Sequence, residues 1–400
     1  MLEFLKLKPE TFGLDISDLS LKIVKLKKKK GSLSLVSFGE KEIPQGIIKE
    51  GEIKDEKLLV EIIKKAVSEA KGEKIETNYI IASLPEEKAF LQVIQMPRLP
   101  EPDLRSAVIF EAENYIPFPI EEVYLDSQIV PPTVDKIDHL DVLIAALPRK
   151  IIDSYCFCFK AAGLIPKVLE IESLAIARSL IKNEISPLPL LLIDLGATRT
   201  SFIIFSGYSL RFTTSVSISS RKFTEAVSRN LKIDFNEADE LKRKYGLGGF
   251  QVKLEVGEEK SEKRVENSRI FEALLPILSD LVEEIEKYLI FYQTHDSHEH
   301  LTPNGRGIEK ILLSGSGANL KGLGGFLSRE LRIPVELANP WINILPEPLK
   351  EVPELNYQES LGYTTALGLA LRGINESPKS KKQRETKIYL SPLIWRKKIK

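Results

Sequence analysis

Alternating apolar and polar positions open the chain and predict β-strands. Residues 12–15 run from apolar side chains into an aspartate, residues 21–26 alternate loosely, and residues 32–38 alternate again. The lysine run at 27–30 separates the last two segments. We interpret it as the solvated turn of a hairpin rather than as a nucleic-acid patch.

Apolar residues then recur at helical spacing between Asp55 and Lys71. Asp55 is the predicted N-cap of this helix and Gly72 its predicted stop, because Asp caps helix starts and Gly ends helices. Residues 78–84 are mostly apolar and predict a buried strand.

A separate small unit is predicted over residues 88–170. Its pattern follows the order strand, helix, strand, strand, helix, strand, which is typical of a small α+β subdomain. The predicted strands are 90–95, 123–130, 142–147 and 167–171, and the predicted helices are 103–115 and 150–162.

The second half of the chain predicts another α/β unit. The segment 190–193 is wholly apolar, as expected in the middle of a sheet that is covered on both faces. Further strands are predicted at 202–205, 209–217 and 311–313, and helices at 172–182, 222–230, 236–245, 271–293 and 360–371.

The composition of the chain argues against a nucleic-acid-binding or secreted protein. Lys and Arg number 57, as do Asp and Glu, so the chain lacks the basic excess of a typical nucleic-acid binder. Its two cysteines, Cys156 and Cys158, lie in an apolar stretch, and we expect buried small side chains rather than a disulfide or a metal pair. The chain shows neither a signal-peptide pattern nor an apolar run near the ~18 residues of a membrane span. We therefore expect a cytoplasmic protein.

Three loops share one design, in which a buried strand runs into an aspartate or small residues and then into a turn. They are residues 13–18, 193–198 and 313–319. Small residues let backbone N–H groups approach a phosphate, and Mg²⁺ would compensate an aspartate at the end of a buried strand. The first two loops, one in each half of the chain, are expected to clamp a triphosphate from both sides.

The order of these loops resembles the phosphate-1, phosphate-2 and adenosine loops of the superfamily that joins actin, the heat-shock chaperone ATPases and the sugar kinases. Finer similarity points to the PilM family, the actin-like proteins of type IV pilus assembly, which are relatives of FtsA. The segments that carry this resemblance are 96–100, 107–119, 161–164, 237–242, 288–293 and 366–370.

The resemblance implies a two-lobed actin-like ATPase fold with a small inserted α+β subdomain. The implied domains are a first lobe of 1–87 and 171–187 with a closing helix in 345–372, an inserted subdomain of 88–170, a second lobe of 188–344, and a basic, flexible tail of 373–400.

The resemblance also implies ATP and Mg²⁺ as cofactors. Asp15 and Asp194 would face Mg²⁺ through water, and Asp239 and Lys242 would contact the ribose or base, with a surface ion pair as the alternative. The residues implied to line the phosphates are Ser17, Asp18, Lys22, Gly196, Ala197 and Thr198. Those implied to line the nucleoside are Gly315, Ser316, Gly317 and Asn319.

This chain departs from the family pattern at Ser17, Asp18 and Ser316. Asp18 is expected to place a negative charge near the phosphates, which would cost affinity. No residue stands out as a general base, so we expect slow hydrolysis or none.

The partner implied by the resemblance is a PilN-like membrane protein whose cytoplasmic tail carries an Asn-Leu-Leu-Pro stretch. The expected groove on the inserted subdomain involves Glu111, Asn114, Tyr115 and Phe118. Residues 342–346 resemble the same stretch. They are either a chance likeness or a segment that neighbouring copies insert into this groove in self-association.

The expected function is a cytoplasmic ATP-binding scaffold of type IV pilus assembly at the inner face of the inner membrane. A membrane-tethered filament protein like FtsA is the alternative, and a sugar or metabolite kinase is a third class. The tail is either an unfolded extension or a surface anchor with weak membrane association. The histidines at 295, 298 and 300 suggest a metal cluster, although a solvated loop is the simpler interpretation.

Overall fold

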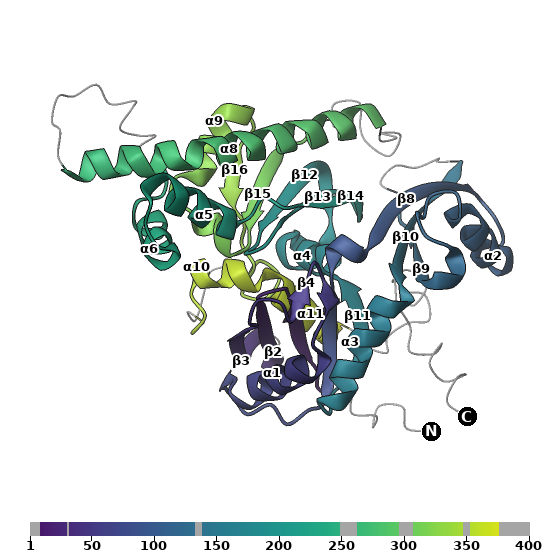
Figure 1. Ribbon diagram of the computed structural model, residues 1–400. Helices are drawn as coiled ribbons and strands as arrows, with labels where there is room; N and C mark the ends of the chain where they lie inside the picture. Colours follow the sequence, from purple (N-terminus) through teal and green to yellow (C-terminus); the bar gives the residue numbers. More distant parts are fainter. Residues whose placement is uncertain are drawn as a thin grey trace.

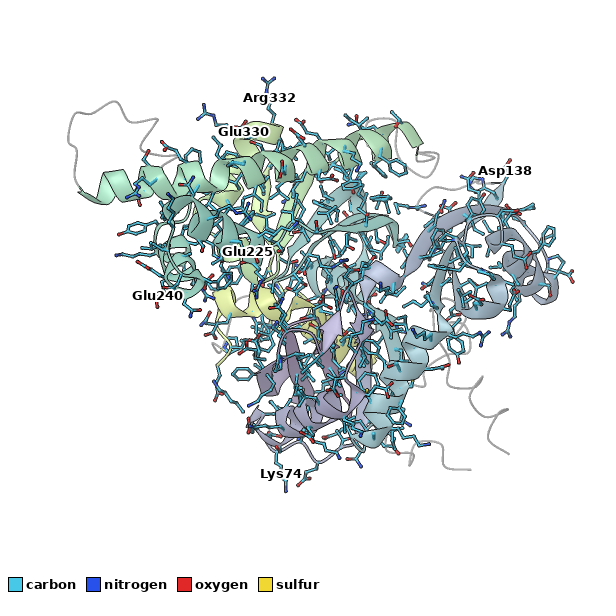
Figure 2. All side chains as sticks on the ribbon, viewed as in Figure 1. Lys74, Asp138, Glu225, Glu240, Glu330 and Arg332 are labelled. Atoms are coloured by element: carbon cyan, nitrogen blue, oxygen red, sulfur yellow. The ribbon has the colours of Figure 1, made fainter. Side chains whose placement is uncertain are left out.

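The computed structural model describes residues 9–29, 32–132, 138–248, 262–295, 307–346 and 353–375. Two sheet-based lobes lie one above the other, and a small third unit lies beside them (Figure 1). Lys74 marks the outer end of the first lobe, Arg332 that of the second, and Asp138 the tip of the small unit (Figure 2).

The first lobe is built on a six-stranded sheet with the order β11-β7-β1-β2-β3-β6. The predicted hairpin is confirmed, because β2 pairs antiparallel with β3. The lysine run is not its turn as predicted, since Lys27, Lys28 and Lys29 belong to β2 and pair with β3. The strands are β1 Phe12–Ile16, β2 Ser20–Lys29, β3 Ser32–Glu42, β6 Lys71–Gly72, β7 Tyr79–Leu84 and β11 Ile165–Ile171.

Helix α1 covers Glu56–Ser68, and Asp55 caps it as predicted, since its side chain accepts a hydrogen bond from Leu58 N at 3.0 Å. The helix ends four residues before the predicted stop at Gly72. Residues 71 and 72 instead pair with β3 as strand β6, and Gly72 adopts a φ of +87° there.

Three further helices complete the first lobe. Helix α3 (Arg149–Ala161) packs on α1, while α11 (Thr364–Asn375) packs on β1, β2, β7 and α4 (Glu172–Leu180). The predicted closing helix is interrupted, because α10 (Tyr357–Ser360) and a 3₁₀ turn precede α11. Both cysteines are buried in α3 as predicted, and burial raises the pKa of each thiol to about 12.

The inserted subdomain has its own three-stranded sheet, in the order β8-β10-β9, and its own apolar core. Its elements are β8 Phe90–Pro97, α2 Glu101–Ala112, β9 Val123–Val130 and β10 His139–Pro148. The predicted boundary at residue 170 is too late: β11 pairs in parallel with β7 of the first lobe, and α3 leads into it. The same strand–helix–strand pattern fits either unit, and only the pairing partner decides between them.

The second lobe holds a five-stranded sheet with the order β14-β13-β12-β15-β16, and helix α8 runs along its outer side (Figure 1). Its strands are β12 Ser186–Leu195, β13 Thr200–Gly207, β14 Ser209–Val216, β15 Lys310–Ser314 and β16 Val335–Leu337. Its helices are α5 Ser220–Leu231, α6 Phe235–Tyr245, α8 Glu262–His295 and α9 Leu323–Leu331.

Two expectations fall on residues outside the described ranges. The tail from residue 376 onward is one, and the histidine cluster is the other, since only the backbone of His295 at the end of α8 is described. Within the ranges that the structure covers, no helix is long and apolar enough to span a bilayer.

Candidate functional site between the lobes

Two aspartates end strands that belong to different lobes. Asp15 lies near the end of β1 and is buried, and among the described residues its Oδ1 has no hydrogen-bond partner. Asp194 lies near the end of β12 and accepts a hydrogen bond from Ser314 Oγ at 2.8 Å. Removal from water, together with the nearby negative charge of Asp15, raises the pKa of Asp194 to about 6. The two carboxylates therefore face one site between the lobes.

Lys22 supplies positive charge to this site. It is the strand partner of Asp15 across the hairpin from β1 to β2. Its charge lowers the pKa of both aspartates and so opposes the larger effect of burial. Its Nζ donates to Ser20 Oγ at 2.9 Å and lies 3.4 Å from Glu40, so it is held at the edge of the site.

The turn after β12 is closed by its own backbone. Gly196 N donates to the carbonyl oxygen of Arg199 at 2.9 Å. The carbonyl oxygens of Gly196 and Ala197 accept hydrogen bonds from the N–H groups of Ser220 and Arg221 at 3.0 and 3.2 Å. Helix α5 therefore begins directly against the predicted phosphate turn, which also contains Thr198.

The turn after β15 lies against the end of β12. Gly315 has a φ of +82°, and a Cβ on it would lie 2.5 Å from the carbonyl oxygen of Leu195. A Cβ on Gly317 would also clash with Leu195, so both positions require glycine for this close approach. Asn319 Nδ2 donates to the carbonyl oxygen of Gln358, which ties the turn to α10. Ser316 lies next to Gly362 in the 3₁₀ turn Leu361–Tyr363, which follows α10.

Asp239 and Lys242 form an ion pair with each other at 2.7 Å. Lys242 is buried and also donates to Thr224 Oγ1 at 2.6 Å and to the carbonyl oxygen of Ser220 at 3.1 Å. Asp239 accepts further hydrogen bonds from Thr224 and Arg243. These contacts join α6 to α5. The two residues form an ion pair, but it is not the surface ion pair of the alternative, because Lys242 is buried.

The expectation for Asp18 needs correction. Its two carboxylate oxygens accept hydrogen bonds from the N–H groups of Glu50 and Gly51, each at 3.0 Å. The side chain therefore points to the Glu50–Gly51 turn, and backbone N–H groups stabilise its negative charge. Ser17 closes the turn from β1 to β2 through hydrogen bonds with Ser20.

Four charged residues of the site were missed by the sequence analysis. Glu86 and Glu87 follow β7, Glu172 begins α4, and Arg199 ends the turn after β12. Burial raises the pKa of Glu172 well above its usual range, and neighbouring carboxylates, Asp15 first among them, raise it further. The sequence did carry a signal for Glu172, because this residue is the first of a predicted helix and directly follows a predicted strand.

These residues fit a hydrated divalent cation. One oxygen of Asp15 has no hydrogen-bond partner among the described residues, and burial raises the pKa of both aspartates despite the charge of Lys22. A bound cation would stabilise their charged forms. Among the described residues, however, no three His, Cys, Asp or Glu side chains converge closely enough to hold a metal by themselves. Water and phosphate ligands would complete the sphere, as Mg²⁺ prefers.

A separate cavity of about 490 Å³ lies where the inserted subdomain meets the first lobe. Phe118 lines it, whereas the other three predicted groove residues, Glu111, Asn114 and Tyr115, do not. Its lining combines apolar and charged side chains, and consists of Glu52, Glu87, Lys88, Ala89, Phe90, Pro117, Phe118, Pro148, Lys150 and Ile151.

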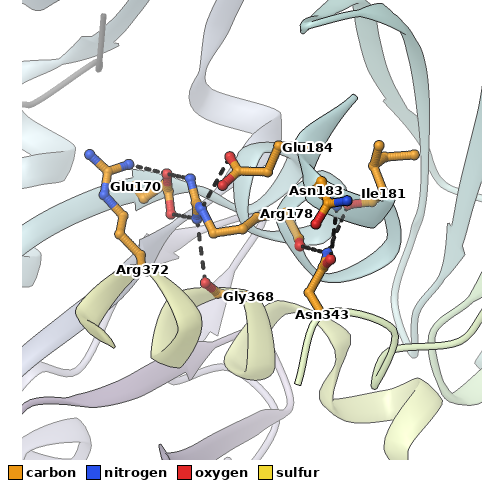
Figure 3. Close-up of polar contacts among 8 residues, drawn as sticks. All are labelled: Glu170, Arg178, Ile181, Asn183, Glu184, Asn343, Gly368 and Arg372. Carbon is orange, nitrogen blue, oxygen red and sulfur yellow. Dashed lines mark hydrogen bonds and ion pairs between the residues drawn. The ribbon is translucent and has the colours of Figure 1, made fainter. Parts of the chain in front are cut away.

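Residues 342–346 are held within their own chain, contrary to the self-insertion alternative. Ile344 is buried in a core with β2 and β3. The Asn343 amide donates to the carbonyl oxygens of Arg178 and Ile181 at 2.9 and 2.7 Å and accepts from Asn183 N at 2.9 Å (Figure 3). Releasing this segment would break these bonds and expose the core.

Comparison with known proteins agrees with the expected fold. A solved structure of a PilM-PilN type IV pilus biogenesis complex contains a chain that is 28% identical, with a TM-score of 0.74, and the match covers 92% of this chain and all of that one. The ethanolamine utilization protein EutJ of Carboxydothermus hydrogenoformans is 14% identical with a TM-score of 0.52, over 91% and 89% of the two chains. The actin-like ATPase fold expected from the sequence is thereby confirmed.

Sequence comparison supports the same relationship. The cell division protein FtsA of Pseudomonas aeruginosa is 21% identical over 231 residues, which are 55% of this chain and 50% of FtsA. The chain therefore spans about half the length of this curated relative. The family model described as "Type IV pilus assembly protein PilM" matches residues 13–374. The chain thus belongs to the PilM family of type IV pilus assembly proteins.

Proposed function

We propose that the chain binds ATP with Mg²⁺ between its lobes. The observation that carries this proposal is the meeting of Asp15 and Asp194 from different lobes, beside Lys22 and two glycine-containing turns. The two aspartates would hold Mg²⁺ through water, and the turns of Gly196 and Gly315 would supply close backbone approach. Bound Mg²⁺ would neutralise phosphate charge.

A structural relative of similar fold supports this proposal. The MreB5 protein of Spiroplasma citri, solved bound to AMPPNP, is 14% identical with a TM-score of 0.50 over 94% of this chain and 98% of its own. The sequence-based argument for weak affinity also loses force, because the Asp18 carboxylate accepts hydrogen bonds at the turn from β4 (Ile48–Lys49) to β5 (Glu52–Ile53). We expect an Asp194→Ala variant to bind Mg·ATP more weakly than the wild type does.

The chain acts in our proposal as a scaffold at the inner face of the inner membrane. The cavity of about 490 Å³ would receive the cytoplasmic tail of a PilN-like membrane protein. Phe90, Phe118 and Ile151 offer apolar contacts to an extended peptide, while Lys88 and Lys150 stand at the rim. The similarity to the chain of the PilM-PilN complex supports a PilN-like partner.

A peptide titration tests the docking site. We expect a synthetic peptide that carries Asn-Leu-Leu-Pro to bind, and a Phe118→Glu substitution to weaken binding at least tenfold, because a charge would face the apolar lining. Fluorescence anisotropy of the labelled peptide measures both affinities.

Phe110→Glu is the matched control for this titration. Phe110 lies on α2 of the same subdomain, is 73% exposed and does not line the cavity. The control should bind the peptide as the wild type does. Equal weakening in both variants, or no change in Phe118→Glu, would exclude the cavity as the docking site.

A further inference from the structure

Two short segments lie between the cavity and the proposed nucleotide site between the lobes. One is the 3₁₀ turn Glu86–Lys88, and the other is the turn that joins β4 (Ile48–Lys49) to β5 (Glu52–Ile53). Glu87, Lys88 and Glu52 line the cavity. The same two segments also contact the loops proposed to bind the nucleotide.

The first contact crosses from one lobe to the other. Glu87 Oε1 lies 3.6 Å from Arg199 Nε, and both side chains are largely removed from solvent. The carbonyl oxygen of Arg199 closes the Gly196 turn, and its guanidinium also donates to Ser215 Oγ at 3.1 Å. A shift of Glu87 would therefore displace Arg199 and the Gly196 turn, which is proposed to face the phosphates.

The second contact lies within the first lobe. Gly51, next to Glu52 of the cavity wall, donates its N–H to Asp18 and accepts a hydrogen bond from the Tyr155 hydroxyl at 3.2 Å. A Cβ on Gly51 would lie 2.5 Å from Pro85 and 3.1 Å from Glu87 Oε1, so the two segments also touch each other. Asp18 itself lies in the turn from β1 to β2, three residues after Asp15.

We propose that a peptide in the cavity and a nucleotide in the cleft bind cooperatively, coupled through the Glu87–Arg199 and Asp18–Gly51 contacts. This inference rests on the proposed function, and it gives Glu87 and Asp18 the role of positioning residues. A peptide that contacts Glu87 and Glu52 orders both segments, so the nucleotide then binds to loops that are already held. Coupling is reciprocal, so nucleotide must tighten peptide binding by the same factor.

The test is a thermodynamic cycle. Mg·ATP is titrated calorimetrically with and without saturating Asn-Leu-Leu-Pro peptide, and the ratio of the two dissociation constants is taken within each variant. We expect a ratio of at least about 5 for the wild type, the lower end of typical allosteric coupling. Glu87→Gln should lower this ratio, because it leaves only the Asp18–Gly51 contact to couple the sites. Both dissociation constants are measured on the same variant. A change in that variant's affinity for Mg·ATP alone or for peptide alone therefore does not change the ratio. A wild-type ratio of 1, or an unchanged ratio in Glu87→Gln, would overturn the inference.

Glu284→Gln is the control, since Glu284 pairs with Lys287 on α8 away from both sites and its variant should keep the wild-type ratio. A second readout needs no peptide. The chain has only two cysteines, both buried, so Lys150→Cys at the cavity rim can be labelled selectively with a fluorophore.

Addition of Mg·ATP alone should shift the emission of this label in the wild-type background and should shift it less with Glu87→Gln. If the peptide fails to bind but the emission shifts, docking of that peptide is wrong and the connection between the sites stands. If the peptide binds, the ratio is 1 and no shift occurs, the docking proposal stands and the coupling does not.

Discussion

Replacement of Glu170 by alanine is expected to lower the free energy of unfolding by about 3–5 kcal/mol, the cost typical of breaking a buried ion pair. Glu170 is 2% exposed and lies between Arg178 and Arg372, which come from α4 and α11 (Figure 3). Two hydrogen bonds of 2.6 and 2.7 Å join it to Arg178. Burial alone would raise the pKa of Glu170, but the two arginines hold it below its usual range. Urea denaturation measures the loss.

Glu69→Ala provides the comparison for this prediction. Glu69 pairs with Lys41 at 2.7 Å, but on the exposed surface of the same lobe. Solvent screens such a pair, so the urea midpoint should stay that of the wild type. Equal behaviour of the two variants would mean that the two arginines find other partners and that the ionic cluster does not hold α11 to α4.

Gly368→Ala should destabilise the first lobe by about 1–3 kcal/mol, the usual cost of overpacking a core. Gly368 lies in α11, and a Cβ there would stand 1.9 Å from the carbonyl oxygen of Ala175 in α4. The two helices would have to move apart, which would also stretch the contact of Arg178 with the carbonyl oxygen of Gly368. The thermal midpoint, measured by circular dichroism, should fall.

Gly325→Ala makes the identical change in helix α9, where a new Cβ meets nothing within 4 Å. This variant should gain up to about 1 kcal/mol, because alanine favours the helix over glycine. A fall in stability in both variants would point to a general effect of the substitution, and the close approach of α11 to α4 would not be its cause.

Local patterns sufficed for most elements of the fold. The alternation in β2 and β3, the capping aspartate at position 55 and the apolar run of β12 each depend on near neighbours in the sequence. The edge of the inserted subdomain could not be derived in this way. Strand β11 has the same pattern whether it joins the small sheet or β7, and that choice is made by tertiary packing.

The residues of the candidate site also differ in whether the sequence alone could identify them. Asp15, Asp194 and Gly315 could be identified because an acidic or small residue after a buried strand is unusual in itself. Glu87 and Arg199 carry no such local signal, since each gains its place only when the two lobes meet.

Asp18 shows the limit of carrying roles across a family. It stands in the phosphate loop by sequence, yet its hydrogen-bond partners lie 32 and 33 residues further along the chain. Lys242 was likewise matched to a nucleoside contact, but Thr224 and Ser220 of the neighbouring helix occupy its amino group. In both cases a polar contact distant in sequence decided where the side chain lies.

Calorimetric titration of Mg·ATP into the full chain shows whether nucleotide binds between the lobes. We expect micromolar binding that requires Mg²⁺ and that Asp194→Ala weakens by about 10–100-fold, as for loss of a group that supports a metal. Asp138→Ala, which changes an exposed aspartate at the tip of the inserted subdomain, should bind as the wild type does (Figure 2). Absence of binding to the wild type, or equal binding by Asp194→Ala, would contradict a nucleotide site between the lobes.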